Sequence, residues 1–176
     1  MNISERLDQA IRTIPDFPKP GIQFKDITPV LRDAVLCRDL VKRLVEPFQE
    51  QEIQVVAGIE SRGFLFGFPV AMKLGIPFIL IRKKGKLPYK TISYKYDLEY
   101  GSAEIEMHVD SIEKGWNVLI HDDLLATGGT AAAAAELIRL QEGNVAGFSF
   151  LVNLDFLNGT SVLDKYSNNI TSLISY

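Results

Sequence analysis

The sequence of 176 residues predicts an α/β fold built on one doubly wound, mainly parallel β-sheet flanked by helices. Apolar runs rich in β-branched residues are typical of strands that are covered on both faces, as in parallel sheets. Helical patterns separate these runs, so the connections are expected to be right-handed parallel crossovers. The apolar runs cover residues 53–59, 77–81, 118–120 and 145–154.

The N-terminal part predicts a helix followed by an extended segment. Apolar residues recur at helical spacing from Ile3 to Ile14, and Pro15 is expected to end this short amphipathic helix. Prolines and a glycine in residues 15–26 exclude a regular helix and favour an extended chain. Two phenylalanines, Phe17 and Phe24, lie in this segment, where they either pack on the domain or face a ligand.

The remaining elements are predicted from strand alternation and from helical spacing of apolar residues. Residues 91–107 alternate aromatic, polar and charged side chains around a glycine, which predicts an antiparallel excursion of two strands. The tail suggests a turn, a brief helix and a final strand. Further helices are expected at residues 38–51, 64–73 and 131–141, with Pro47 shortening or kinking the first of them.

Composition limits the classes of function. A length of 176 residues favours one domain, and 47% apolar residues supply its core. The net charge of −3 argues against a general nucleic-acid binder. The one cysteine excludes an internal disulfide and favours a reducing, cytoplasmic compartment. No apolar span has membrane length, and the two histidines, His108 and His121, show no zinc spacing.

The stretch from Val118 to Thr130 carries the most informative motif. An apolar run ends in Asp122 and Asp123, and the turn Thr127-Gly128-Gly129-Thr130 leads into an alanine-rich helix. Backbone N–H groups at a helix start favour an anion, and the two carboxylates suit the hydroxyls of a sugar. These features predict a ribose 5-phosphate cradle. The alternative is an ordinary strand-to-helix turn with Gly for tightness and Asp or Thr as a cap.

Cationic residues follow two other predicted strands. Arg62 lies in Glu60-Ser61-Arg62-Gly63, and four cations lie among the five residues 82–86. The carboxyl ends of strands in an open α/β sheet are where ligands bind, so both segments are candidate anion sites. A solvated arginine and a solvated charged face are the alternatives.

Taken together, these motifs resemble those of type I phosphoribosyltransferases. Residues 120–130 are similar to their binding motif for phosphoribosyl diphosphate (PRPP). Within the family, their sequence is most similar in form to that of the adenine phosphoribosyltransferases. The segments at 17–26, 60–64, 81–88 and 96–101 resemble further motifs of that family in the expected order. The resemblance implies a single phosphoribosyltransferase domain over residues 1–176. It would have an N-terminal helix and base-binding hood at about 1–35 and a flexible catalytic flap at about 83–107.

The resemblance also implies roles for individual residues. Catalytic roles fall on Glu99, Arg62, Asp122 and Asp123. The loop of Arg62 is expected to contain a cis peptide bond. The adenine-binding set is Ile22, Phe24, Lys25 and Leu124, with the main chain near Ile22 and Lys25 contacting the base. The PRPP-binding set comprises Arg62, Arg82, Lys83, Lys86, Tyr100, Asp122, Asp123, Ala126, Thr127, Gly128, Gly129 and Thr130.

The implied reaction joins adenine to PRPP and gives AMP and diphosphate, a step of purine salvage. Mg²⁺ would accompany PRPP, held mainly by substrate and water, with no protein metal ligands. A homodimer is implied by the likeness alone, and no nucleic-acid or membrane partner is expected. We interpret His121 as a strand residue with a local hydrogen bond. Two alternatives stay open: another purine (xanthine, hypoxanthine or guanine), or a PRPP-sensing regulator without turnover.

Overall fold

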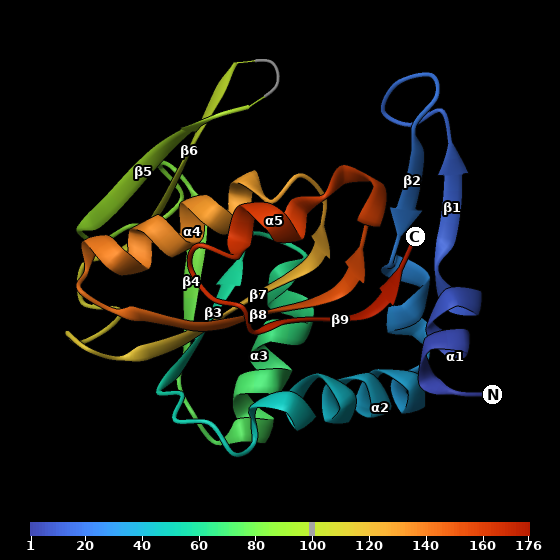
Figure 1. Cartoon of the computed structure of the whole chain (residues 1–176), viewed down its shortest axis with the longest axis horizontal. Coiled ribbons are helices and arrows are strands. Elements are labelled where there is room, and N and C mark those ends of the chain that lie inside the picture. The colour runs from blue at the N-terminus through green and yellow to red at the C-terminus, as the bar shows by residue number, and fades with distance from the viewer. Residues whose placement is uncertain (99–100) are drawn as a thin grey trace.

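A mixed β-sheet forms the centre of the molecule in the computed structural model, which describes residues 1–98 and 101–176 (Figure 1). Within these residues the sheet has seven strands, in the order β5-β6-β4-β3-β7-β8-β9. The last five in this order are parallel to one another. They are β4 (Phe78–Lys83), β3 (Val55–Ile59), β7 (Asn117–Leu125), β8 (Asn144–Asn153) and β9 (Ile170–Ser175). The predicted doubly wound sheet is therefore confirmed.

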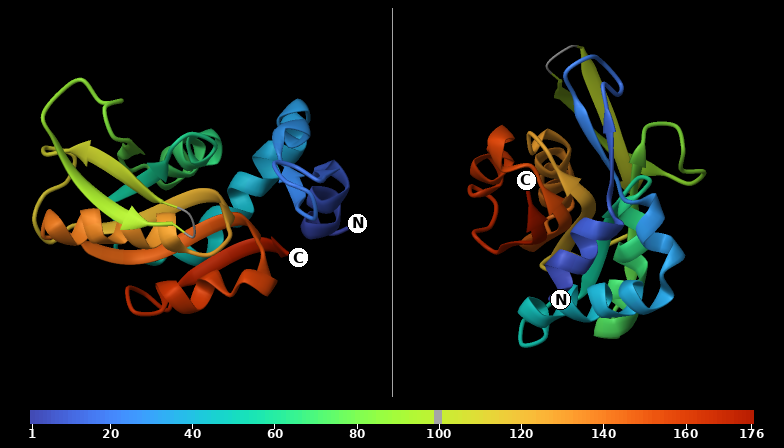
Figure 2. Two further views of the ribbon diagram at one scale, coloured as in Figure 1. Left: turned by 90° about the horizontal axis from the view of Figure 1, so that it is seen from above. Right: turned by 90° about the vertical axis from the view of Figure 1, so that its right-hand side faces the viewer.

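Helices cover both faces of this sheet, as Figures 1 and 2 show. On one face, α3 (Gly63–Leu74) packs on β3 and β7, and α2 (Ala34–Val45) and α1 (Ile3–Ala10) lie beyond it. On the other face, α4 (Gly129–Leu140) packs against β7 and β8, with α5 (Gly159–Leu163) beside it. Strand β3 is buried along its whole length, which explains its continuous apolar run. Short 3₁₀ turns cover Thr28–Arg32, Glu46–Phe48 and Asp155–Leu157.

The predicted antiparallel excursion is present. Strands β5 (Thr91–Asp97) and β6 (Ser102–His108) pair along their full length. They join the main sheet through β4, where Arg82 pairs with Glu106 and Lys83 with Ile105. Figure 1 shows this hairpin leaning over α4. The flap is thus an extension of the central sheet at its β4 edge.

The N-terminal helix is shorter than the periodicity predicts. It ends at Ala10, and Arg12–Pro15 forms a strand, β1, instead of the last helical turn. Strand β2 (Gln23–Asp26) pairs with β1, so that Ile14 lies opposite Phe24. The backbone hydrogen bonds of this pairing replace those of a helix, and Pro15 is tolerated at the end of an edge strand. Local periodicity could not reveal a partner ten residues away.

Strand β7 is longer than the sequence predicts. It runs past Ile120 and includes Asp122 and Asp123. Neighbouring β8 explains the difference, because Asp122 pairs with Phe150 and Leu124 with Val152. The two carboxylates therefore belong to a strand that β3 and β8 flank, and not to a loop.

The hood hairpin and the flap hairpin rise on the same side of the molecule. The right-hand view of Figure 2 shows β1–β2 and β5–β6 both projecting upward, and Figure 1 shows them at opposite ends. Strands β3 and β7 run toward this side, so their carboxyl ends lie between the two hairpins. None of the helices in the described part of the chain has the length and apolar character that a membrane crossing requires.

Candidate active site

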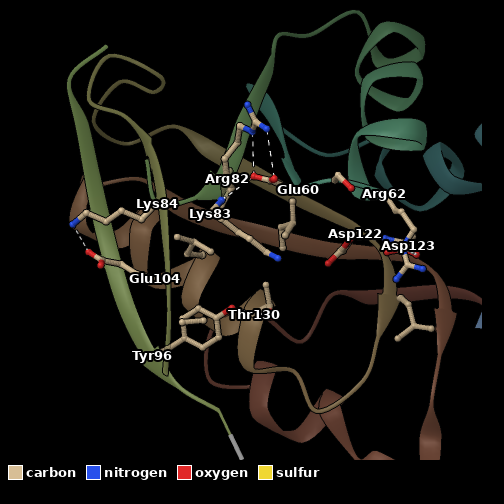
Figure 3. Close-up of a pocket in the computed structure, with 16 residues that line it drawn as sticks. Glu60, Arg62, Arg82, Lys83, Lys84, Tyr96, Glu104, Asp122, Asp123 and Thr130 are labelled. Atoms are coloured by element: carbon tan, nitrogen blue, oxygen red, sulfur yellow. Dashed lines mark hydrogen bonds and ion pairs between the residues drawn. The ribbon is translucent and has the colours of Figure 1, made fainter. Parts of the chain in front are cut away.

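A pocket of about 520 Å³ lies at the carboxyl ends of β3, β4 and β7 (Figure 3). Its walls come from four segments that are distant in sequence: residues 59–62, 81–84, 122–124 and the flap strands. Thr130, at the start of α4, also lines it. The pocket therefore brings together both predicted cationic segments and the predicted cradle, as expected for the ligand edge of an α/β sheet.

Two carboxylates form the middle of the pocket wall. Asp123 is buried, and Asp122 accepts a hydrogen bond from the Asp123 backbone N–H at 2.9 Å. Burial, and then the neighbouring Asp123 charge, raise the pKa of Asp122 well above its ordinary value. Gly63 allows the close approach of α3, because a Cβ there would lie 2.9 Å from the Asp122 Oδ1. The carboxylate oxygens of Asp122 and Asp123 can accept hydrogen bonds from hydroxyl groups of a ligand.

Arg62 bridges this wall and the hood. Its Nε lies 2.9 Å from Oδ2 of Asp123, and its guanidinium lies 5.2 Å from the ring centroid of Phe24. The peptide bond between Glu60 and Ser61 is cis, as the family resemblance implies. Arg62 is therefore placed where an anion and a planar base would meet.

The cationic end of β4 is ordered by a carboxylate. Oε2 of Glu60 accepts hydrogen bonds from Nε of Arg82 at 3.1 Å and from the backbone N–H of Lys83 at 2.9 Å. Burial raises the pKa of Glu60, but these hydrogen bonds outweigh it, so the pKa lies below its ordinary value. Figure 3 shows the Lys83 side chain reaching into the pocket beside this pair. The Lys83 ammonium thus faces the space that an anion would enter.

The predicted phosphate cradle forms a second, smaller cavity of about 80 Å³. It is lined by residues 124–131 and Asp122, so it shares Asp122, Leu124 and Thr130 with the larger pocket. Gly128 caps α4 with φ of 84°, a left-handed conformation that glycine adopts without strain. The N-terminus of α4 points its backbone N–H groups and its positive dipole end at this cavity. An anion bound there would be joined to the carboxylate wall.

The flap contacts the cradle directly. The hydroxyl of Tyr96 on β5 lies 3.1 Å from Oγ1 of Thr130. Two further flap contacts are formed by Glu104, which accepts hydrogen bonds from Nζ of Lys84 at 2.5 Å and from Oγ of Ser93 at 2.6 Å. The flap therefore closes one side of the pocket.

The other predicted site residues lie around this centre. Leu124 lines both cavities. Ile22 and Phe24 lie on the hood, and the Lys25 ammonium lies 3.6 Å from the ring centroid of Tyr176. Lys86 is exposed in the turn after β4 and does not line the pocket. The predictions for Glu99 and Tyr100 fall outside the described residues.

His121 has a structural environment. It is fully buried, and its Nδ1 lies 3.2 Å from Oγ of Ser149 on β8. Burial lowers its pKa to about 3, so the imidazole is neutral at physiological pH. This agrees with a strand residue that makes a local hydrogen bond.

Three carboxylate and hydroxyl groups of the site had no predicted role. They are Glu60, Tyr96 and Glu104, which order the cations and link the flap to the cradle. Glu60 begins the predicted anion loop at a strand end, so its place in the sequence could have indicated a role in the site. The partners of Tyr96 and Glu104 are set by strand register in the flap, which a single sequence does not reveal.

Comparison with known proteins shows the family of this chain. Residues 25–174 match the model of the phosphoribosyl transferase domain family. An adenine phosphoribosyltransferase of Nitrosococcus oceani is 54% identical over 172 residues, 98% of this chain and 99% of the relative.

Solved structures of adenine phosphoribosyltransferases are similar to this chain over nearly its whole length. The adenine phosphoribosyltransferase of Thermoanaerobacter pseudethanolicus superposes with a TM-score of 0.94 at 47% identity, covering 98% of this chain and 99% of the other. The enzyme of Saccharomyces cerevisiae, solved with adenine and an imino-altritol bisphosphate, gives 0.90 at 40% identity and covers 98% of each chain. The chain therefore belongs to the phosphoribosyl transferase domain family and, within it, to the adenine phosphoribosyltransferases.

Proposed function

We propose that this chain transfers the 5-phosphoribosyl group of PRPP to adenine and releases AMP and diphosphate, as a glycosyltransferase of purine salvage. One observation carries the proposal: the carboxylates of Asp122 and Asp123 lie between a helix-terminal anion cradle and a cationic strand end. PRPP has the matching order of groups, with a 5-phosphate, ribose hydroxyls and a diphosphate. The relatives named adenine phosphoribosyltransferase support the choice of base.

PRPP would be gripped at both ends. The cradle residues Ala126, Thr127, Gly128, Gly129 and Thr130 hold the 5-phosphate with backbone N–H groups and hydroxyls. The Asp122 and Asp123 carboxylates accept hydrogen bonds from the ribose hydroxyls. Cationic side chains hold the diphosphate and neutralise the charge that grows as it leaves. These are Arg62, Arg82, Lys83 and Lys86, with Tyr100 covering the group.

The reaction exchanges one bond for another at the ribose C1. The bond from C1 to the diphosphate oxygen breaks with its electron pair, and the purine N9 supplies the pair for the new bond. Between these events C1 resembles an oxocarbenium ion, which the Asp122 and Asp123 charges stabilise. The Glu99 carboxylate accepts the ring proton that the purine loses as the new bond forms. A closed flap excludes water, which would otherwise compete as the nucleophile.

Adenine would bind on the hood side of the pocket. Phe24 supplies an aromatic face and Leu124 an aliphatic one, and main-chain groups near Ile22 and Lys25 read the edge of the purine. Arg62 joins this side to the rest of the pocket, because its guanidinium lies 5.2 Å from the Phe24 ring centroid.

Mg²⁺ fits the donor set as a companion of PRPP. Within the described residues, no three His, Cys, Asp or Glu side chains are grouped to hold a metal ion. Mg²⁺ commonly binds through substrate phosphates and water with few carboxylates, so PRPP and water would supply its ligands. The bound ion would neutralise diphosphate oxygens.

A cytoplasmic homodimer completes the proposal. Leu65, Phe68 and Met72 on α3 are 41%, 52% and 67% exposed, and an apolar groove lies between α3 and α2. Exposed apolar patches of this kind mark interaction sites. Cys37 is the one cysteine of the chain, which agrees with a reducing compartment. Sedimentation equilibrium measures the assembly state, and a monomer at micromolar concentration would contradict the dimer.

A base-competition assay tests the activity. The enzyme is given PRPP and Mg²⁺ with adenine, hypoxanthine, guanine and xanthine, and nucleotide and diphosphate are quantified. We expect AMP with an equal amount of diphosphate. A preference for a 6-oxopurine would overturn the choice of base, and tight PRPP binding without diphosphate release would support a regulator instead.

A further inference from the structure

A buried carboxylate that the proposed mechanism does not use lies at the base of the flap. Glu106 on β6 is 2% exposed. Its Oε1 accepts hydrogen bonds from the backbone N–H groups of Lys86 and Leu87, both at 3.0 Å. Its Oε2 accepts one from Oγ1 of Thr91 at 3.1 Å. Buried carboxylates persist only where such donors satisfy them, so this side chain has a fixed position.

The bonds of Glu106 hold the turn that follows β4. Gly85 in this turn has φ of 85°, and the Lys86 N–H also lies 3.3 Å from the Lys83 carbonyl oxygen. Burial raises the pKa of Glu106, but hydrogen bonds from Leu87, Gly85, Thr91 and Lys86 outweigh it and lower the pKa overall. Glu106 is therefore ionised near neutral pH.

Glu60 and Arg82 hold the other side of the same turn. Nη1 of Arg82 donates to the Lys86 carbonyl oxygen at 3.2 Å, and Glu60 fixes Arg82 and the Lys83 N–H. Glu60 thus accepts from the backbone N–H of Lys83, and Glu106 accepts from that of Lys86. Among the described residues, neither lysine ammonium forms an ion pair within 4.0 Å. The carboxylates shape the turn and leave these two charges for an anion.

We propose that Glu106 is a positioning residue for diphosphate binding: its carboxylate fixes the turn of residues 83–87 and ties it to the flap through Thr91. This inference rests on the proposed function, because it takes the diphosphate of PRPP as the ligand of the turn. Thr91 is the first residue of β5, so one side chain joins the cationic turn to the hairpin that closes the pocket.

Two substitutions of Glu106 separate the effect of its side-chain length from the effect of its charge. Glu106→Gln removes the charge, but its amide oxygen still accepts from Lys86 and Leu87 while its NH₂ donates to the Thr91 hydroxyl. Glu106→Asp keeps the charge but shortens the side chain by one methylene, so the oxygens withdraw from these donors. A purely electrostatic role would make the glutamine variant the worse of the two. The positioning role makes the aspartate variant worse.

Steady-state kinetics and amide hydrogen exchange test the proposal. In Glu106→Asp we expect the KM for PRPP to rise about tenfold, with the KM for adenine changed less than about twofold. Amide exchange at Lys86 and Leu87 should quicken. Glu106→Gln should stay within about threefold of wild type for PRPP. The matched controls, Glu113→Asp and Glu113→Gln in an exposed loop, should leave all parameters unchanged.

Several outcomes would overturn the proposal. One is a glutamine variant weaker for PRPP than the aspartate variant, and another is a proportional loss of kcat and of both affinities. Calorimetric PRPP binding keeps the test separate from turnover. If wild type binds PRPP without forming AMP, the proposed function fails, and the order of PRPP affinities among the variants still decides the role of Glu106.

Discussion

Nε of Arg62 lies 2.9 Å from Oδ2 of Asp123, so a cation proposed to bind diphosphate is paired with a carboxylate proposed to bind ribose. The same guanidinium lies 5.2 Å from the Phe24 ring centroid. Arg62 therefore contacts the proposed binding regions of all three substrate parts. In the proposed function, diphosphate would compete with Asp123 for this side chain.

Arg62→Lys should impair the use of PRPP. Lysine keeps one positive charge but loses the planar fork that pairs with Asp123 and lies against Phe24. We expect kcat/KM for PRPP to fall about 10²-fold, the scale for one lost transition-state donor. Thermal stability should change little, since the Arg62 side chain is 36% exposed. Arg32→Lys, an exposed position, is the control, and an unchanged kcat/KM in Arg62→Lys would refute this role.

Asp122→Asn should stabilise the fold while lowering activity. Burial and the Asp123 charge raise the pKa of Asp122, so the folded chain keeps this proton to a higher pH than the unfolded chain. The stability linked to Asp122 is full in acid and falls as pH rises through the folded pKa. The asparagine variant should gain about 1 kcal/mol at neutral pH, or roughly 2–4 °C in Tm. Thermal unfolding at several pH values measures this, and a lower Tm at neutral pH would contradict it.

Substitution by alanine should destabilise the fold at Gly128 but not at its neighbour Gly129. At Gly128, with φ of 84°, a Cβ would lie 2.6 Å from the Gly159 carbonyl oxygen. At Gly129 the closest atom is Thr127 Oγ1 at 3.9 Å, within ordinary contact distance. We expect Gly128→Ala to lose about 1–3 kcal/mol of unfolding free energy and Gly129→Ala to lose almost none. Urea denaturation of both variants checks the pair, and equal losses would contradict the backbone argument.

His121 should make the fold sensitive to acid. Its pKa is about 3 in the folded chain, where burial disfavours the charged form. Below the ordinary pKa near 6.5 the unfolded chain binds a proton that the folded chain rejects, so stability falls as pH falls toward 3. The double variant His121→Leu with Ser149→Ala removes this group without leaving a lone buried hydroxyl. Its unfolding free energy should fall less steeply between pH 6 and 4, by up to about 1.4 kcal/mol per pH unit. An unchanged slope would contradict the assignment.

The sequence predicts those parts of the molecule that depend on local periodicity or on a short motif. The apolar run at 53–59 contains strand β3, and the helix expected at 131–141 forms as α4, because continuous burial and alanine propensity act locally. The strand Arg12–Pro15 and the extension of β7 to Leu125 depend on partners elsewhere, namely β2 and β8. The periodicity within either segment does not indicate those partners.

The candidate site divides in the same way. Arg62, Asp122 and Asp123 follow predicted strands and meet at one sheet edge, as topology requires. The carboxylates that arrange the cations, Glu60 and Glu106, gain their partners only through strand register and turn geometry. A glutamate in a strand carries no sign of which backbone N–H it will accept from.

The most direct test of the account is diphosphate release from PRPP and adenine by the double variant Asp122→Asn with Asp123→Asn. Amide side chains keep the size of the carboxylates but remove the charges that stabilise the oxocarbenium-like ribose. We predict Mg²⁺-dependent release by wild type and a loss of at least about a thousandfold in the double variant, with an unchanged circular dichroism spectrum. Near-normal release by the folded double variant would contradict the central claim that these carboxylates carry the ribose chemistry.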